Sequence, residues 1–220
     1  MITFDQISQN REIRTYIKRG NELLGTLGYT EHSFIHAGRV ASCAANILSI
    51  LHYNARTVEL ARIAGFMHDI GNVINRYDHA QSGAILSFQI LTRLGMEAEE
   101  IATVIGAIGN HDEGTGGNVN PVAAALILAD KSDVRRSRVR NTNTSAFDIH
   151  DRVNFAVKDP TVLSCDPQKN SISLEMHIDT SICSIMDYFE IFLQRMMMCR
   201  RAADYFDLKF ELIINNARML

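Results

Sequence analysis

The stretch Ile63–Gly71 reads IAGFMHDIG, and it places a histidine and an aspartate side by side at the end of an apolar helical run. Burying such a pair is costly unless a metal ion or hydrogen bonds satisfy its polar atoms. Neighbouring side chains on a helix diverge by about 100°, yet both can reach an ion that lies between their directions. Asp69 is the better candidate for a bridge, because each carboxylate oxygen can face one ion. The stretch therefore predicts a helix that ends in a pair of side chains held either by a metal ion or by hydrogen bonds.

Other candidate ligands lie on both sides of this pair in the sequence. Asp130 ends the apolar run Val122–Ala129, where an aspartate is costly to bury without a partner. His36, His79 and His111 belong to the same half of the chain, each in a distinctive local context. Imidazole nitrogens and carboxylate oxygens suit divalent Fe, Mn, Ni or Zn, and helical bundles build internal metal sites from ligands on separate helices. We therefore expect these side chains to meet.

The spacing of apolar residues predicts that residues 1–135 form successive α-helices. From Ile35 to Leu51 the apolar positions recur near every 3.6 residues. Capping residues indicate where further helices begin and end. These helices run from Asn54 through His68 with Gly71 as the C′ glycine, from the capping pair Asp78 and Gln81 to about Gly95, over Glu97–Ile108, and from Asn120–Pro121 through Asp133.

The pattern changes in the last third of the chain. Residues 161–165 and 171–178 alternate as strands do around a turn-rich segment, which predicts a β-hairpin. A helix over about residues 181–205 and a strand over residues 210–214 complete a ββαβ unit. We therefore expect a mainly α fold with two parts, an all-α helical bundle in residues 1–145 and a small C-terminal α+β subdomain in residues 146–220.

Composition excludes several classes of protein. Apolar residues make up 46% of the 220 residues, which is enough for a core, and the net charge of −3 excludes a globally basic nucleic-acid coat. The longest apolar run is far shorter than the ~20 residues of a membrane helix, and the N-terminal residues lack an apolar signal core. Four dispersed cysteines without a CxxC motif favour reduced thiols. We expect a cytoplasmic protein without a membrane or a stable nucleic-acid partner.

The spaced histidines and aspartates resemble the HD-domain superfamily of metal-dependent phosphohydrolases over roughly residues 30–135. His36 matches the first metal ligand of that family, and Asp130 matches the last. His68 and Asp69 match the pair that names the superfamily. The resemblance implies that these four residues hold a metal ion and that His68 and Asp69 are the catalytic pair.

His79 and His111 match the two additional histidines of the dinuclear branches of this superfamily. These branches include the HD-GYP cyclic-dinucleotide phosphodiesterases and the bacterial symmetrical diadenosine tetraphosphate hydrolases, and the segment from His79 to Gly83-Ala84 resembles the latter. Ile70-Gly71-Asn72 stands where the HD-GYP family has Ile-Gly-Lys, and no Gly-Tyr-Pro motif follows, which counts against that phosphodiesterase type. The resemblance implies two divalent ions, with Fe or Mn first and Zn, Ni or Mg as alternatives.

Basic residues follow the last candidate ligand directly. Residues 131–140 are rich in lysine and arginine, and arginine forks match the geometry of phosphate oxygens. A solvated basic helix end is the alternative interpretation of each of these side chains. The candidates for binding substrate phosphate are Arg39, Lys131, Arg135, Arg136 and Arg138.

Together these features predict a hydrolase that uses metal-activated water to cleave a phosphoester or phosphoanhydride of a nucleotide or another small phosphorylated molecule. Two other functions use the same features. A di-iron HD-type oxygenase would consume O2 instead of releasing phosphate, and a regulatory HD module would bind a nucleotide without metal-dependent turnover. A homodimer is compatible with the sequence.

Overall fold

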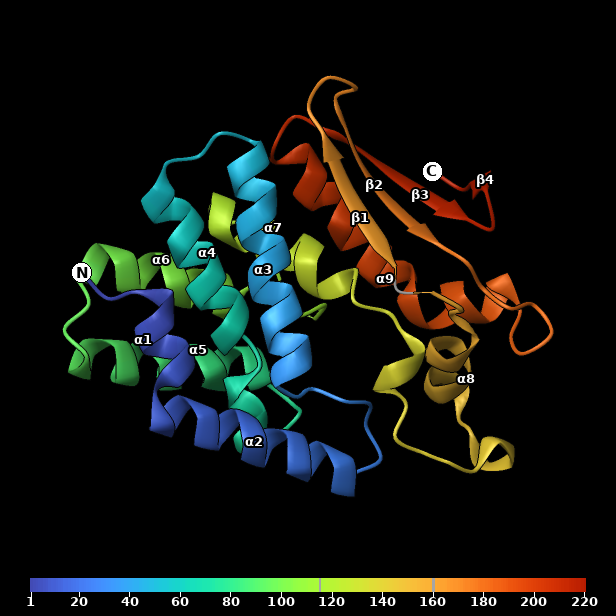
Figure 1. The fold of residues 1–220 in the computed structure, drawn as a ribbon, viewed down its shortest axis with the longest axis horizontal. Coiled ribbons are helices and arrows are strands. Elements are labelled where there is room, and N and C mark those ends of the chain that lie inside the picture. Colours follow the sequence, from blue (N-terminus) through green and yellow to red (C-terminus); the bar gives the residue numbers. More distant parts are fainter. Residues whose placement is uncertain (115, 160) are drawn as a thin grey trace.

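The computed structural model describes residues 1–114, 116–159 and 161–220, and it shows a helical part followed by a small sheet (Figure 1). The helical part contains α1 (Phe4–Gln9), α2 (Arg11–Thr26), α3 (Phe34–Ile50), α4 (Ala55–Met67), α5 (His79–Arg93), α6 (Ala98–Gly109) and α7 (Pro121–Lys131). The short 3₁₀-helices are η1 (Ile70–Val73), η2 (Arg136–Arg138) and η3 (Thr144–Ala146). The second part contains α8 (Ile149–Ala156), β1 (Val162–Asp166), β2 (Ser171–Met176), α9 (Ile185–Asp204), β3 (Lys209–Ile214) and β4 (Ala217–Arg218).

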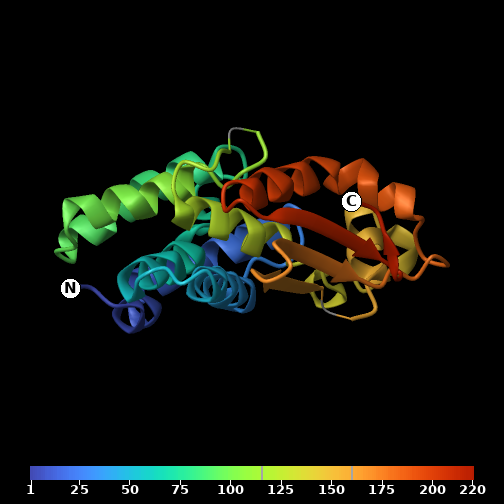
Figure 2. The ribbon, with the colours of Figure 1, turned by 90° about the horizontal axis from the view of Figure 1, so that it is seen from above.

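The strands form one mixed sheet in the order β1-β2-β3-β4. β1 pairs antiparallel with β2 as a hairpin, β2 pairs parallel with β3, and β3 pairs antiparallel with β4. A parallel pair needs a long crossover connection, and α9 supplies it between β2 and β3. Figure 2 shows α9 lying along one face of the sheet. The predicted mainly α fold with a C-terminal α+β appendage is confirmed.

Helix α7 lies at the centre of the molecule. The whole run Val122–Ala129 is buried, as expected for a helix that is apolar on every side. α7 packs against α3, α4 and α6 of the helical part and against α9 of the appendage. Asp130 directly follows this buried run and therefore lies in the interior, at the C-terminal end of α7.

The backbones of α3 and α4 approach each other closely at Gly65. A Cβ atom at this position would lie 2.7 Å from Cα and 2.8 Å from N of Ala41. Both distances are far below a normal van der Waals contact, so only glycine allows these two helices to pack at their observed separation. This contact matters for the site, because α3 carries His36 and α4 ends beside His68.

We expect Gly65→Ala to lower the free energy of unfolding by about 1–3 kcal/mol, because the added methyl group must push α3 and α4 apart. Gly38→Ala is the matched control on α3, since a Cβ there meets nothing within 4 Å. That change should raise stability by about 0.5–1 kcal/mol through the higher helix propensity of alanine. Urea unfolding curves measure both, and equal effects of the two substitutions would contradict the packing argument.

Two of the predicted helix starts are confirmed in detail. The side chain of Asn54 accepts a hydrogen bond from the backbone N of Thr57 at 2.9 Å and caps α4. Asn120 accepts one from Ala123 N at 2.8 Å and caps α7, where the proline at residue 121 takes the first helical position. α7 ends at Lys131, two residues before the predicted end.

The predicted capping pair at the start of α5 is wrong. Asp78 has a positive φ of 55° and makes no capping hydrogen bond with its side chain. Gln81 instead donates from Nε2 to the carbonyl oxygen of Gly109, which joins α5 to the end of α6. The helix itself is confirmed over His79–Arg93, and Gly95 has the positive φ of 80° expected just after a helix end.

The predicted C′ role of Gly71 is also wrong. Gly71 lies inside η1, and α4 ends four residues earlier at Met67. A Cβ atom at Gly71 would collide with the carbonyl oxygen of His79. The glycine therefore permits η1 to press against the first turn of α5, and it brings the His-Asp pair close to His79.

In the appendage the hairpin, the long helix and the following strand are confirmed. Helix α8 and strand β4 were not predicted, and β4 extends the expected ββαβ unit by one short strand. The predicted boundary at residue 145 falls within η3 and stays a prediction. Among the described residues, no helix combines the length and apolarity needed to cross a membrane.

Candidate metal centre

The ends of several helices position the candidate ligands. They lie in the first turn of α3 (His36), directly after α4 (His68 and Asp69), at the first residue of α5 (His79), just after α6 (His111) and in the last turn of α7 (Asp130). α3, α4 and α7 contact one another, and α5 packs against both α6 and η1. These contacts bring the six side chains together, and we call them the His/Asp cluster.

One group in the cluster consists of His36, His68 and Asp130, whose ligand atoms all lie within 4.8 Å of one another. The Nε2 atoms of His36 and His68 are 3.3 Å apart. Asp130 Oδ1 lies 3.2 Å from Nε2 of His36 and 3.5 Å from Nε2 of His68. Three donor atoms thus point at one common space.

The second group is built around His111 and His79, whose Nε2 atoms are 3.2 Å apart. Asp69 lies between the two groups. Its Oδ2 is 3.2 Å from His68 Nε2 and 3.5 Å from His36 Nε2, whereas its Oδ1 is 3.5 Å from His79 Nε2. Oδ2 of Asp69 therefore faces His36 and His68, and Oδ1 faces His79, which is the arrangement a bridging ligand requires.

All four histidines of the cluster use the same ring nitrogen for support. Nδ1 lies within hydrogen-bond distance of an oxygen that can only accept, so Nδ1 carries a proton in each ring and Nε2 is the atom left to bind a metal ion. The accepting atoms are Asp133 Oδ2 at 2.7 Å from His36, Gly65 O at 2.8 Å from His68, Arg76 O at 3.0 Å from His79 and Ile108 O at 2.6 Å from His111. Such support fixes the ring orientation that metal-ligating histidines need.

The cluster fits a divalent cation. The four histidine side chains are buried, and a buried set of nitrogen and carboxylate donors is stable only with a positive charge among them. Asp69 Oδ2 is buried and receives no hydrogen bond from any described residue. Nitrogen and carboxylate ligands in this number suit Fe, Mn, Zn or Ni. The His/Asp cluster is compatible with metal binding.

The charges within the cluster shift its pKa values strongly. Burial lowers the pKa of His68, but the carboxylates of Asp69 and Asp130 outweigh burial and raise this pKa to about 10. Burial raises the pKa of Asp69, and the charge of His68 outweighs it and holds the pKa well below its usual value. In the protein alone a proton on His68 supplies positive charge between the carboxylates. A metal ion must displace that proton to bind Nε2.

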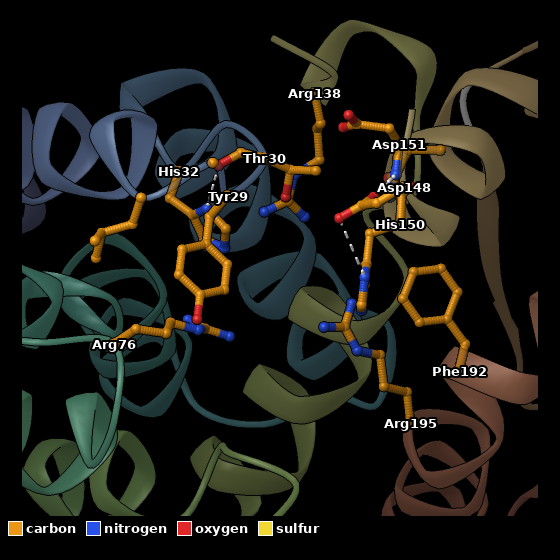
Figure 3. A pocket seen from close by; sticks show the side chains of 13 residues that line it. Tyr29, Thr30, His32, Arg76, Arg138, Asp148, His150, Asp151, Phe192 and Arg195 are labelled. Atoms are coloured by element: carbon orange, nitrogen blue, oxygen red, sulfur yellow. Dashed lines mark hydrogen bonds and ion pairs between the residues drawn. The ribbon is translucent and has the colours of Figure 1, made fainter. Parts of the chain in front are cut away.

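Two cavities adjoin the cluster. The inner cavity, of about 10 Å³, is lined by cluster residues including Asp69, His79, His111 and Asp130. The outer cavity, of about 280 Å³, lies between the segment 27–30 and helices α8 and α9 (Figure 3). Both cavities are lined by the same four side chains, His32, Arg76, Arg138 and Arg195. We call these four residues the neck, because they connect the cluster to the outer cavity.

Of the predicted phosphate ligands, Lys131 and Arg138 lie at the cavities. Lys131 lines the inner cavity, with Nζ 2.7 Å from Asp130 Oδ2 and 3.4 Å from Glu113 Oε1. Arg138 is buried and is held by hydrogen bonds from Nε to the carbonyl oxygen of Glu31 and from Nη1 to that of Asp133. Both side chains are placed to meet an anion beside the cluster.

The structure does not bring the other three predicted phosphate ligands to these cavities. Arg39 Nε and Arg135 Nε lie 2.9 and 3.1 Å from Asp133 Oδ1, so both arginines pair with a protein carboxylate. Arg136 is exposed, donates from Nε to the carbonyl oxygen of Phe155 and stacks on that ring. Arg135 and Arg136 are close to Asp130 in the sequence, but neither of them lines a cavity beside the cluster.

Three neck residues were not predicted from the sequence. Arg76 precedes His79 by three residues, and its Nη1 lies 3.3 Å from Nε2 of that histidine. This short spacing is a signal that could have identified it. His32 precedes His36 by four residues, and this short spacing is a comparable signal. Arg195 comes from α9 in the appendage, and no local pattern links it to the cluster.

Asp133 is expected to orient His36, because its Oδ2 accepts the Nδ1 proton at 2.7 Å and its side chain is buried. We expect Asp133→Ala to weaken metal binding by about 10- to 100-fold, as removal of such supporting carboxylates does. Titration of metal into chelator-treated protein measures this effect. Asp133→Asn keeps an acceptor oxygen, so it should lose less metal affinity than the alanine variant. Unchanged affinity in the alanine variant, with a normal melting profile, would show that His36 needs no such support.

The comparison with protein families agrees with this site. A family model described as HD domain matches residues 33–150, which is more than half of the chain. An uncharacterized protein of Methanocaldococcus jannaschii is 27% identical over 170 residues, covering 67% of this chain and 65% of that protein. A crystal structure described as a predicted HD superfamily hydrolase from an uncultured Thermotogales bacterium is 26% identical, covers 54% of this chain and 66% of that one, and has a TM-score of 0.41.

The chain thus spans just under two thirds of the length of each of these two relatives. The matched family region contains every residue of the His/Asp cluster, and it includes α3 through η3 of the helical part. The chain belongs to the HD domain family.

Proposed function

We propose that this protein is a metal-dependent hydrolase that cleaves a phosphoester or phosphoanhydride bond in a small phosphorylated molecule, with nucleotides as the first candidates. The observation that carries the proposal is the neck: three arginines from separate parts of the chain lie directly between the His/Asp cluster and the outer cavity. Guanidinium groups bind phosphate oxygens through paired hydrogen bonds. An anionic group in the neck would have its scissile bond beside the cluster.

The His/Asp cluster would hold two divalent ions, with Fe or Mn first and Zn, Ni or Mg as alternatives. His36, His68 and Asp130 would bind one ion, His79 and His111 the other, and Asp69 would bind both. When bound, such ions lower the pKa of a water molecule towards neutrality and so supply a nucleophile. This ligand set supports the dinuclear branch that the sequence resembles.

The side chains of the chain itself would bind and orient the substrate. Arg138, held rigidly by two backbone carbonyl oxygens, and Arg76 and Arg195 on the opposite sides of the neck would hold the phosphate oxygens. Lys131 at the inner cavity would neutralise negative charge as it develops in the transition state. The buried walls of the inner cavity would exclude bulk water and so strengthen these interactions.

The test combines metal analysis with a screen for phosphate release. Protein purified without chelator should contain close to two equivalents of metal and should release phosphate from at least one nucleotide or sugar phosphate. Chelation should abolish the release, and added Mn²⁺ or Fe²⁺ should restore it. Consumption of O2 without phosphate release would favour the oxygenase alternative. Tight nucleotide binding without turnover in the metal-loaded protein would favour a regulatory module.

We expect Arg195→Ala to lower kcat/KM by about 10- to 150-fold while metal content stays normal, because it removes a charged contact to phosphate and no ligand. Arg200→Ala is the matched control, since Arg200 is an exposed arginine on the same helix. The control should stay within about 0.5 kcal/mol of the parent in stability and should keep full activity. Equal activities of the two variants would remove Arg195 from the substrate site.

A further inference from the structure

The outer cavity has two ends of opposite charge. One end is the neck, with the guanidinium groups of Arg76, Arg138 and Arg195. The other end is formed by α8, which contributes Asp148 and Asp151. Figure 3 shows Arg76 across the cavity from the two aspartates, with Arg138 between them and Arg195 beside His150. A ligand that fills this cavity meets cations at one end and carboxylates at the other.

The neck keeps donor groups available for a ligand. Arg195 uses Nε for its ion pair with Glu113 at 2.6 Å, and its guanidinium group stacks on the ring of Phe192. Arg138 uses Nε and Nη1 for backbone carbonyl oxygens. In the described part of the chain, the Nη atoms of Arg195 and Nη2 of Arg138 have no hydrogen-bond partner. These donors suit the oxygens of a single phosphate group.

The α8 end carries the carboxylates of Asp148 and Asp151 together with the ring of His150, whose Nδ1 lies 3.9 Å from Asp148 Oδ2. Asp148 caps α8 by accepting from Asp151 N through Oδ1, and Asp151 is partly buried beside it. Asn154 lines the same wall and is only 4% exposed. Its Nδ2 donates to the carbonyl oxygen of His150 at 2.9 Å, and its Oδ1 has no hydrogen-bond partner among the described residues. An unpartnered acceptor on a buried side chain, next to two carboxylates, favours a ligand that donates hydrogen bonds.

We propose that the outer cavity selects phosphomonoesters whose organic part carries hydroxyl or amino groups, with the phosphate in the neck and these donor groups against Asp148, Asp151 and Asn154. This inference rests on the proposed hydrolase function and narrows its substrate class. A second phosphate at the α8 end would meet two carboxylates, so nucleoside triphosphates and dinucleoside polyphosphates fit the cavity poorly. The substrate class thus differs from that of the diadenosine tetraphosphate hydrolases that the sequence resembles.

The test compares matched phosphomonoesters with the metal-loaded full-length protein. Glycerol 3-phosphate and ethanolamine phosphate carry donors, and propyl phosphate has a similar size without them. Adenosine 5′-monophosphate and 5′-triphosphate share one organic part and differ in phosphate number. We expect at least one donor-bearing ester to have a kcat/KM about 10-fold higher than that of propyl phosphate. We also expect a higher kcat/KM for the monophosphate than for the triphosphate. Comparing glycerol 3-phosphate with ethanolamine phosphate shows whether the cavity prefers hydroxyl or amino donors.

The double substitution Asp148→Asn and Asp151→Asn tests the acidic wall. We expect it to reduce the preference for donor-bearing esters to about 3-fold or less and to raise the activity on the triphosphate relative to the monophosphate. Asp204→Asn, an exposed aspartate on α9 that does not line the cavity, should leave both ratios unchanged. Asn154→Asp is the opposite change, because it adds a third carboxylate, and it should further disfavour the triphosphate.

The outcomes separate this inference from the function on which it rests. If the protein releases phosphate neither from these esters nor from any nucleotide or sugar phosphate of the screen in any metal form, the proposed function fails. If it hydrolyses them but prefers propyl phosphate or the triphosphate, the hydrolase proposal stands and the inference about the outer cavity is wrong. That inference is equally wrong if the double variant keeps every ratio of the parent while its melting profile shows a folded protein. Competitive inhibition by orthophosphate, weakened in Arg195→Ala, independently reports on the neck.

Discussion

Replacing Asp69 with alanine is expected to have the largest effect of any single change in this protein. The carboxylate lies between the two histidine groups, with Oδ2 3.2 Å from His68 Nε2 and Oδ1 3.5 Å from His79 Nε2. Removing it takes a ligand from both proposed ions at once. We expect metal content to fall from about two equivalents to well below one, and kcat/KM to fall by at least about 10³-fold. Metal quantification and phosphate-release kinetics measure the two losses.

Two further variants make this result specific. Asp69→Asn keeps the size of the side chain but removes its negative charge. We therefore expect its metal content to fall nearly as far as that of the alanine variant. Asp112→Ala removes a neighbouring carboxylate whose Oδ1 is 3.9 Å from His79 Nε2 and whose side chain is 31% exposed. We expect it to reduce activity less than about 10-fold, as a peripheral group would. Full metal content in Asp69→Ala would show that this carboxylate bridges nothing.

His111→Ala should convert a two-metal protein into a one-metal protein. Nε2 of this buried ring lies 3.2 Å from Nε2 of His79, and its Nδ1 is fixed by the carbonyl oxygen of Ile108. The substitution removes a ligand from one group and leaves the group around His36 intact. We expect close to one equivalent of metal and a loss in kcat of about 10²-fold or more, because the second ion no longer stabilises charge in the transition state.

The control for this prediction is His177→Ala, which removes a half-exposed histidine outside the cluster. It should change neither metal content nor turnover. His79→Ala should reproduce the effect of His111→Ala, since both rings belong to the same group. If both variants retain two equivalents of metal and parental turnover, the dinuclear proposal is wrong, and the remaining four candidate ligands would describe a one-metal centre.

Local sequence patterns predicted much of the fold because helix formation and capping depend on near neighbours. The apolar run Val122–Ala129 after Asn120–Pro121 predicted α7, and that helix is buried with the expected cap. The alternation of residues 171–178 likewise predicted β2. Helix α8 and strand β4 are short, at eight and two residues, so their patterns are too brief to detect. The parallel pairing of β2 with β3 joins segments separated by α9, and local periodicity does not reveal it.

The sequence by itself determined the candidate ligands, because adjacent His68 and Asp69 at the end of an apolar helix are costly to bury unless they bind a metal ion or hydrogen-bond partners. Only the tertiary structure decided which cations face them. Arg135 lies near Asp130 in the sequence but pairs with Asp133, whereas Arg195, far along the chain, lines the cavity beside the cluster. Each candidate ligand is marked by its own few neighbours in the sequence, but the partner of a long charged side chain depends on which surfaces the packed helices bring together.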